Sequence, residues 1–162
     1  MQLRFALLVA ALAAAAPIGA HAETAIGGSY LYNRETGGPF AGNDSGYRVF
    51  LGGYRSTAGA EVAFVNFGRL GGGDGPHAQA WTSDVRFGVP IWKLQTFVKV
   101  GLARSRVSGT AISEESNHYR IFYGGGIRVG EDKGFGVRAE YERYKLDSDA
   151  LEVIAGSIDY RF

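Results

Sequence analysis

After residue 22, apolar and polar side chains alternate with a period of two, in segments of about ten residues separated by clusters of Gly, Asp, Asn and Ser. Such alternation is typical of β-strands whose two faces meet different surroundings. In the C-terminal segment, Tyr160 and Phe162 share one face while Asp159 and Arg161 share the other. The pattern predicts eight strands, at 25–33, 46–54, 59–67, 80–89, 94–104, 118–129, 135–144 and 151–162.

The connections between these strands alternate in length. Long polar connections occupy 34–45, 68–79 and 105–117, and short turns lie between them. An even number of strands with alternating long and short connections is typical of bacterial outer-membrane barrels. We therefore predict an all-β fold, an eight-stranded antiparallel up-and-down transmembrane β-barrel with both chain ends on the periplasmic side.

One face of the predicted strands is apolar, and the other carries charges of both signs. In a soluble sandwich or lipocalin-like barrel the apolar face would point inward, and alternation alone does not settle the direction. Aromatic residues near the strand ends and the unequal connections favour apolar side chains toward lipid and charges toward a polar lumen. The aromatic girdle is then expected to include Tyr30, Tyr32, Trp81, Tyr119 and Tyr141.

The N-terminus has the three parts of a secretory signal peptide. Arg4 supplies the positive charge, residues 5–16 are apolar, and Ala20-His21-Ala22 forms a cleavage site. A retained anchoring helix is the alternative, but a membrane span needs about 20 apolar residues. We predict a signal peptide at 1–22, which supports the lipid-facing orientation, and an outer-membrane barrel domain at 23–162.

Composition narrows the functional classes further. Removal of residues 1–22 takes away Arg4 and leaves 16 Lys and Arg against 16 Asp and Glu. A mature chain without net charge argues against a nucleic-acid partner. The absence of Cys excludes disulfides and thiolate chemistry.

Several segments resemble the eight-stranded transmembrane domain of outer membrane protein A (OmpA) and its small OmpX-type relatives. These segments are GGYRSTAGAEVAFVNFGR (52–69), VRFGVPI (85–91), RAEYERY (138–144) and the closing SIDYRF. They occur in the family's order across residues 23–162. Because the chain ends at Phe162, we expect it to lack the periplasmic peptidoglycan-binding domain of full-length members.

The resemblance implies a plugged polar lumen crossed by ion pairs. Glu61 and Arg86 match an acid–base pair on neighbouring strands, and the sequence departs from the family at Arg128, where an acid is usual. Arg128 and Arg138 therefore need other partners, for which Glu140, Glu142 and Asp159 are the candidates. The expected lumen network comprises Glu61, Arg86, Lys99, Arg128, Arg138, Glu140 and Glu142.

The same resemblance gives the chain end a role. Outer-membrane barrels commonly end with an aromatic residue, which the barrel-assembly machinery recognises. Ile158, Tyr160 and Phe162 occupy such alternating positions. They are also suited to a periplasmic aromatic girdle, and the two roles are compatible.

Candidate catalytic and metal-binding residues are few. His77 and His118 lack the spacing of a metal site. Some eight-stranded barrels modify lipid A, but Ser116 and His118 stand in the wrong order for a barrel deacylase. The segment 71–75 lacks the Lys-Ser/Thr of a phosphate loop. We predict no enzyme activity and no catalytic, cofactor-binding or metal-binding residue.

Eight strands leave an interior just wide enough for side chains, which excludes a wide diffusion porin. The predicted function is a structural or surface-interaction role in the cell outer membrane, in adhesion or envelope integrity. A narrow gated pore and a lipid A-modifying enzyme are the alternatives. The expected partners are outer-membrane lipid and lipopolysaccharide, the barrel-assembly machinery, and a host or surface ligand at loops 34–45, 68–79 and 105–117.

Overall fold

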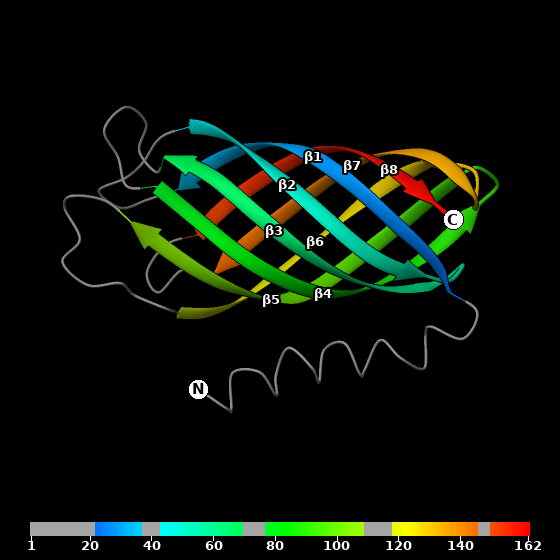
Figure 1. The fold of residues 1–162 in the computed structure, drawn as a ribbon, viewed down its shortest axis with the longest axis horizontal. Helices are drawn as coiled ribbons and strands as arrows, with labels where there is room; N and C mark the ends of the chain where they lie inside the picture. Colours follow the sequence, from blue (N-terminus) through cyan, green and yellow to red (C-terminus); the bar gives the residue numbers. More distant parts are fainter. Residues whose placement is uncertain (1–21, 37–42, 70–76, 109–117, 146–149) are drawn as a thin grey trace.

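The computed structural model describes residues 22–36, 43–69, 77–108, 118–145 and 150–162. Eight strands form a closed barrel in which each strand pairs antiparallel with the next and β8 pairs with β1 (Figure 1). The predicted all-β, eight-stranded antiparallel barrel is confirmed. The strands are β1 (Glu23–Thr36), β2 (Asn43–Tyr54), β3 (Ala58–Arg69), β4 (His77–Ile91), β5 (Leu94–Ser108), β6 (His118–Gly130), β7 (Gly134–Lys145) and β8 (Ala150–Arg161).

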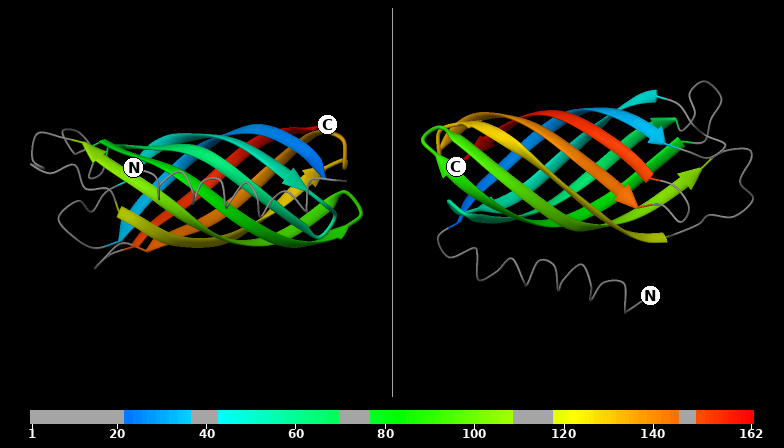
Figure 2. Two further views of the ribbon diagram at one scale, coloured as in Figure 1. Left: turned by 60° about the horizontal axis from the view of Figure 1, so that its bottom comes forward. Right: turned by 180° about the vertical axis from the view of Figure 1, so that it is seen from behind.

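The two ends of the barrel differ in their connections (Figure 2). Both the start of β1 and the end of β8 lie at the end that carries the short turns between β2 and β3, β4 and β5, and β6 and β7. We call this the turn end. The other four connections lie at the opposite end, the loop end. Residues 1–21 of the predicted signal peptide and residues 37–42, 70–76 and 109–117 of the long connections lie outside the described residues.

The strands reach further toward the loop end than the sequence predicted. Residues 34–36, 43–45, 68–69, 77–79 and 105–108 belong to strands rather than to the predicted long connections. Polar residues continue the ladder there because neighbouring strands still offer backbone hydrogen-bond partners. Pro90 also does not end β4, which continues to Ile91. The turn that follows needs a left-handed residue, which Trp92 supplies with a φ of 57°.

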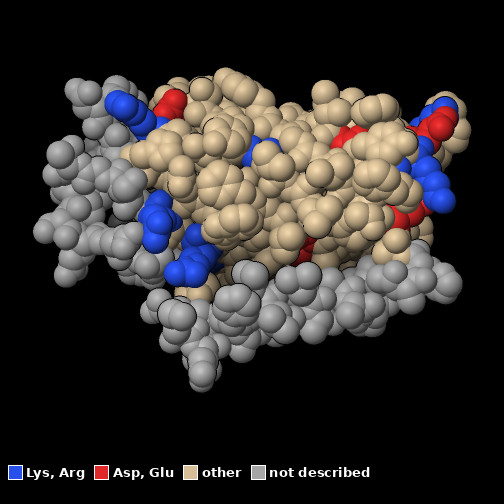
Figure 3. All heavy atoms as spheres, viewed as in Figure 1, with Lys and Arg blue, Asp and Glu red and all other residues tan. Residues whose placement is uncertain are grey.

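Side chains alternate between the inside and the outside of the barrel along every strand. The outward apolar side chains remain about half exposed; Val49 is 52% exposed and Trp81 61%. The buried residues include most of the charged side chains of the strands' other face. In Figure 3 the middle of the visible face is mostly uncharged, and Lys, Arg, Asp and Glu gather near the two ends. Among the described residues, no helix is long and apolar enough to cross a membrane.

Glycines on β6 make room for two inward carboxylate side chains of β7. Gly124 pairs with Glu142 and Gly126 pairs with Glu140 across the β6–β7 ladder. A Cβ atom at Gly126 would lie 2.4 Å from the backbone oxygen of Ala139 and 3.1 Å from Cγ of Glu140. Because Gly124 and Gly126 have no side chains, the carboxylates of Glu142 and Glu140 can extend across the barrel interior.

Candidate functional site

The most distinctive feature of the molecule is a set of charged side chains sealed inside the barrel. They come from seven of the eight strands, and each is at most 6% exposed. Their backbone positions follow from the period-two alternation, which points all of them inward. The set comprises the cations Arg48, Arg86, Lys99, Arg128, Arg138 and Arg161 and the acids Glu61, Asp84, Glu140, Glu142 and Asp159.

A first group of ion pairs lies in the middle of the barrel. Lys99 Nζ lies 2.6 Å from Glu140 Oε2 and 2.5 Å from Glu142 Oε1. Arg48 contacts the same two acids, with Nη2 3.1 Å from Glu140 Oε2 and Nη1 on Glu142 Oε1. Tyr144 donates its hydroxyl hydrogen to Glu142 Oε2 at 2.7 Å. Two cations and two acids from β2, β5 and β7 therefore neutralise one another.

A second group surrounds Glu61 on β3. Arg86 Nη2 and Arg138 Nη1 each lie 2.9 Å from Glu61 Oε2. Tyr54 donates its hydroxyl hydrogen to the same carboxylate, and Arg138 Nη2 donates to the Tyr54 oxygen at 3.1 Å. Arg86 Nε also approaches Asp84 Oδ1 at 3.4 Å. The structure thus brings together Glu61 and Arg86, the pair that the OmpA resemblance implies.

Arg128 and Arg138, whose partners could not be assigned from the sequence, share one acid. Arg128 and Arg138 lie opposite each other on β6 and β7, and Ser157 lies opposite Arg138 on β8. Asp159 stands between the guanidinium groups, with Oδ1 2.9 Å from Arg128 Nη2 and Oδ2 2.5 Å from Arg138 Nε. One carboxylate with two oxygen atoms bridges two like charges, which would otherwise repel each other. Of the three candidates, Asp159 contacts both arginines.

The other two candidates differ. Glu140 lies 3.6 Å from Arg138 and much closer to Lys99, while the carboxylate of Glu142 binds Arg48 and Lys99. Arg48, Asp84 and Asp159 also belong to the network, although none of them was among its seven expected members. All three share the inward parity of those members, and Asp159 was already a candidate partner of Arg128 and Arg138.

Aromatic rings fill the space between the ion pairs. The guanidinium of Arg138 lies 4.3 Å from the Phe50 ring centroid, and that of Arg86 lies 4.7 Å from the Phe97 centroid. Closer to the loop end, Phe122 stacks on Tyr144 with ring centroids 4.7 Å apart. Sequence reasoning assigned aromatics only to the lipid face and missed these rings. Their parity along each strand, which they share with the charged residues, would have identified them.

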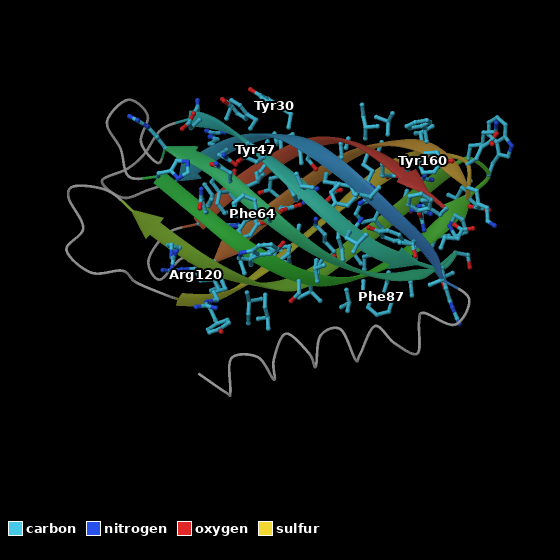
Figure 4. The ribbon with its side chains drawn as sticks, in the orientation of Figure 1. Tyr30, Tyr47, Phe64, Phe87, Arg120 and Tyr160 are labelled. Carbon is cyan, nitrogen blue, oxygen red and sulfur yellow. The ribbon has the colours of Figure 1, made fainter. Side chains whose placement is uncertain are left out.

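Outward aromatic residues form two zones, which Figure 4 shows around Tyr30, Tyr47 and Phe64 near the loop end and around Phe87 and Tyr160 near the turn end. The five residues expected in the girdle are all exposed, and their strand positions place them toward the loop end: Tyr30, Tyr32, Trp81, Tyr119 and Tyr141. At the turn end, Tyr160 packs against Phe135 and Phe162, with ring centroids 4.9 and 5.1 Å apart.

The C-terminal residues lie in the sheet rather than beyond it. Ile158, Tyr160 and Phe162 all point outward and are exposed. Phe162 donates its backbone N–H to the oxygen of Thr24 at 2.9 Å, which holds the chain end against β1. The role of these three residues as an assembly signal stays a prediction.

The histidines do not assemble into a site. His77 begins β4 and His118 begins β6, and each pairs with a residue of β5. The described residues contain no group of three or more His, Cys, Asp and Glu that could hold a metal ion. Ser116 and the glycine-rich segment 71–75 lie outside the described residues.

Comparison with known proteins defines the fold class. No protein-family model and no curated protein matches the sequence. Ail, an outer membrane protein of Yersinia pestis, matches with a TM-score of 0.59 and 18% identity over 87% of this chain and 99% of that chain. The N-terminal β-barrel domain of Pseudomonas aeruginosa OprF matches with a TM-score of 0.62 and 14% identity over 88% of this chain and 100% of that chain. Neisserial surface protein A matches with a TM-score of 0.59 and 10% identity over 86% of this chain and 97% of that chain.

These identities are low, and the likeness is one of fold. The chain has the fold of the small outer-membrane β-barrels, as its resemblance to the OmpA and OmpX-type barrels predicts.

The shared carboxylate of Asp159 gives a direct test of the network. Asp159→Asn removes the one acid that Arg128 and Arg138 share, and of the two arginines Arg138 keeps its ion pair with Glu61. We expect the free energy of unfolding to fall by about 3–5 kcal/mol, the usual cost of removing one partner from a buried ion pair. Urea unfolding of the barrel refolded in lipid vesicles measures this change.

Glu131→Gln is the matched control for that experiment. Glu131 forms an ion pair with Lys93 at 3.1 Å on the exposed rim of the turn end. Its loss is expected to change the free energy of unfolding by less than about 1 kcal/mol, because solvent screens exposed pairs. Equal losses in the two variants would contradict the importance of the buried network.

Proposed function

We propose that this protein is a small barrel of the cell outer membrane with a structural or surface-interaction role, in adhesion or envelope integrity. The observation that carries the proposal is the inverted polarity of the barrel, with charges buried inside and apolar side chains outside. Lipid suits such an exterior, and a closed barrel pairs its backbone groups without water. Export through the signal peptide at 1–22 and insertion by the barrel-assembly machinery are part of the proposal.

The interior supports a plugged lumen rather than a diffusion pathway. Ion pairs and aromatic rings from opposite walls meet across the barrel, as Arg48 with Glu142 and Arg138 with Glu61 do. The cavity between Arg86 and Arg138 has a volume of about 10 Å³, which is at the lower limit for a single water molecule. Such a lumen suits a scaffold that holds loops at the membrane surface.

The exterior of the loop end favours anionic lipid as a partner. Arg34, Arg106, Arg143 and Lys145 are exposed near the loop-side ends of their strands, just beyond the aromatic zone. Trp81, Arg104 and Arg106 line a surface groove of about 200 Å³. Guanidinium groups bind phosphate oxygens well, and the phosphates of lipopolysaccharide would lie at this level if the loop end faces the cell exterior.

The loops are the proposed contact with a host or surface ligand, through 34–45, 68–79 and 105–117. One supporting observation comes from a protein with the same fold: Ail was crystallised with sucrose octasulfate, a heparin analogue. The basic side chains that flank the loop end here suit a sulfated or otherwise anionic ligand.

A narrow gated conduit is the second candidate. Arg138 contacts three acids, Glu61, Asp159 and, at 3.6 Å, Glu140. A cation with several acids nearby can move from one acid to another and remain paired throughout. A gate built from ion pairs requires this property. We propose no enzymatic role, since five of the six buried cations of the described residues pair with buried acids and the described histidines stand at strand ends.

Trp81 tests the orientation of the barrel. In a Trp92→Phe variant, Trp81 is the only tryptophan, and we expect brominated lipids to quench its fluorescence strongly because its side chain lies on the proposed lipid face. In the matched Trp81→Phe variant, the remaining Trp92 at the turn end should be quenched less. Quenching of Trp81 by aqueous iodide but not by brominated lipid would refute the membrane location.

Loop replacement tests the surface role. Exchanging residues 109–117 for a short Asn-Gly turn should leave a heat-modifiable, folded barrel, because the described β5–β6 ladder, from Leu94 with Val129 to Ser105 with His118, is kept intact. Binding to host cells and to heparin beads is expected to fall several-fold. A substitution in the turn 131–133 serves as the control. Unchanged binding after shortening all three long loops would count against the surface role.

Planar-bilayer recording separates the two candidate functions. The plugged barrel predicts no discrete conductance, and the conduit predicts small steps that change with Glu61→Gln or Arg86→Gln. Steps in the wild type that both variants alter would favour the conduit. A silent bilayer in which antibody detects inserted protein would eliminate it.

A further inference from the structure

The buried charges of the barrel do not balance. Among the described residues, six cations and five acids are buried in its interior. Arg48, Arg86, Lys99, Arg128 and Arg138 each form at least one ion pair with an acid. The sixth cation, Arg161 on β8, forms none with the acids of the described chain, the terminal carboxylate of Phe162 included.

Arg161 is nevertheless deeply buried. Only 5% of its surface is exposed, and its Nε has no hydrogen-bond acceptor among the described residues. Its Nη2 donates to the side-chain oxygen of Gln95 at 3.1 Å, and its guanidinium lies 4.6 Å from the ring centroid of Tyr54. A neutral amide and an aromatic ring offset a buried charge only in part. The environment of Arg161 therefore lacks a full negative charge.

A cavity adjoins this guanidinium at the turn end. Its volume is about 310 Å³, and its lining includes Tyr54, Gln95, Arg128 and Arg161. This volume is many times the roughly 10–15 Å³ that a single water needs, so the space can admit a small ion with part of its hydration shell. We call this cavity the turn-end vestibule.

The lining of the vestibule favours an anion over a cation. Arg55, Lys93, Arg128 and Arg161 contribute positive charge to its walls. Glu23 and Asp132 also line it, but neither lies within about 4 Å of Arg161, the limit for an ion pair. Arg128 already pairs with Asp159, so Arg161 is the one buried cation of the lining that has no acid.

We propose that the turn-end vestibule is an anion-binding site, in which a small oxyanion or a carboxylate binds to the guanidinium of Arg161. The bound anion supplies the missing sixth negative charge and accepts hydrogen bonds from the guanidinium, whose planar donors suit two oxygen atoms of one group. The site lies at the opposite end from the proposed surface loops. The proposal rests on the buried charges, on the burial of Arg161 and on the adjoining cavity, and it does not depend on the proposed surface role.

Thermal unfolding of the barrel in a nonionic detergent tests the site. At matched ionic strength, inorganic phosphate should raise the unfolding midpoint saturably relative to chloride. For a ligand that binds only the folded state, a concentration of 100 Kd raises the folded-to-unfolded ratio about 100-fold. An acetate series distinguishes a carboxylate from an oxyanion. Equal midpoints in chloride, phosphate and acetate would overturn the proposal.

Variants of the vestibule assign the effect to Arg161. Arg161→Gln should abolish the saturable response, and the matched control Arg55→Gln should keep it, because Arg55 is an exposed residue of the same vestibule. A response that survives in Arg161→Gln, or one that Arg55→Gln removes equally, would refute the assignment.

Gln95→Glu keeps the proposal testable even if Arg161→Gln does not fold. It places a carboxylate where the amide oxygen now accepts a hydrogen bond from Arg161. We expect a higher midpoint without added phosphate and no further rise when phosphate is added. Gln79→Glu, on the outside of β4 at the loop end, should leave the phosphate response intact. An undiminished response in Gln95→Glu would contradict the proposed site.

Discussion

The structure depends on one constraint: charges in the narrow interior of an eight-stranded barrel must neutralise one another over distances of a few ångströms. The interior is just wide enough for side chains, and an unpaired buried charge is costly. Four of the five buried acids of the described residues therefore serve more than one donor, and Asp84 pairs with Arg86 alone. Glu140 and Glu142 are shared by Arg48 and Lys99, and Asp159 is shared by two arginines.

This constraint explains features that otherwise look unrelated. Gly124 and Gly126 leave β6 without side chains at the positions opposite Glu142 and Glu140, so that these carboxylates have space to cross the interior. Inward rings such as Phe50 close the gaps and lie over the guanidinium groups. The result is an interior that acts as the core of the molecule, in which polar and charged side chains are nearly as numerous as apolar ones, and an exterior whose apolar residues fit lipid.

Much of this organisation could be predicted from the sequence. Period-two alternation identified all eight strands and placed Glu61, Arg86 and Arg138 on the inward face. It was less informative at the strand ends, because polar residues such as Arg34 and Gln79 continue the ladder where hydropathy no longer distinguishes strand from loop. The inward aromatic residues were missed for a similar reason: an aromatic side chain suits either face of such a strand, and only its parity shows which.

Which side chains share a face can be read from the chain alone, because alternation is a local property of an extended backbone. Which of these side chains form ion pairs with one another depends on the folded barrel. Arg48 and Glu142 are 94 residues apart, and Arg138 and Glu61 are 77 apart. Their contacts depend on the register of every intervening strand pair and on the closure of β8 against β1. In the closed barrel Arg161 has no ion pair with a described acid. Its contacts at the turn end are with Gln95 and Tyr54, which are distant in the sequence and lie beside it only because the barrel closes.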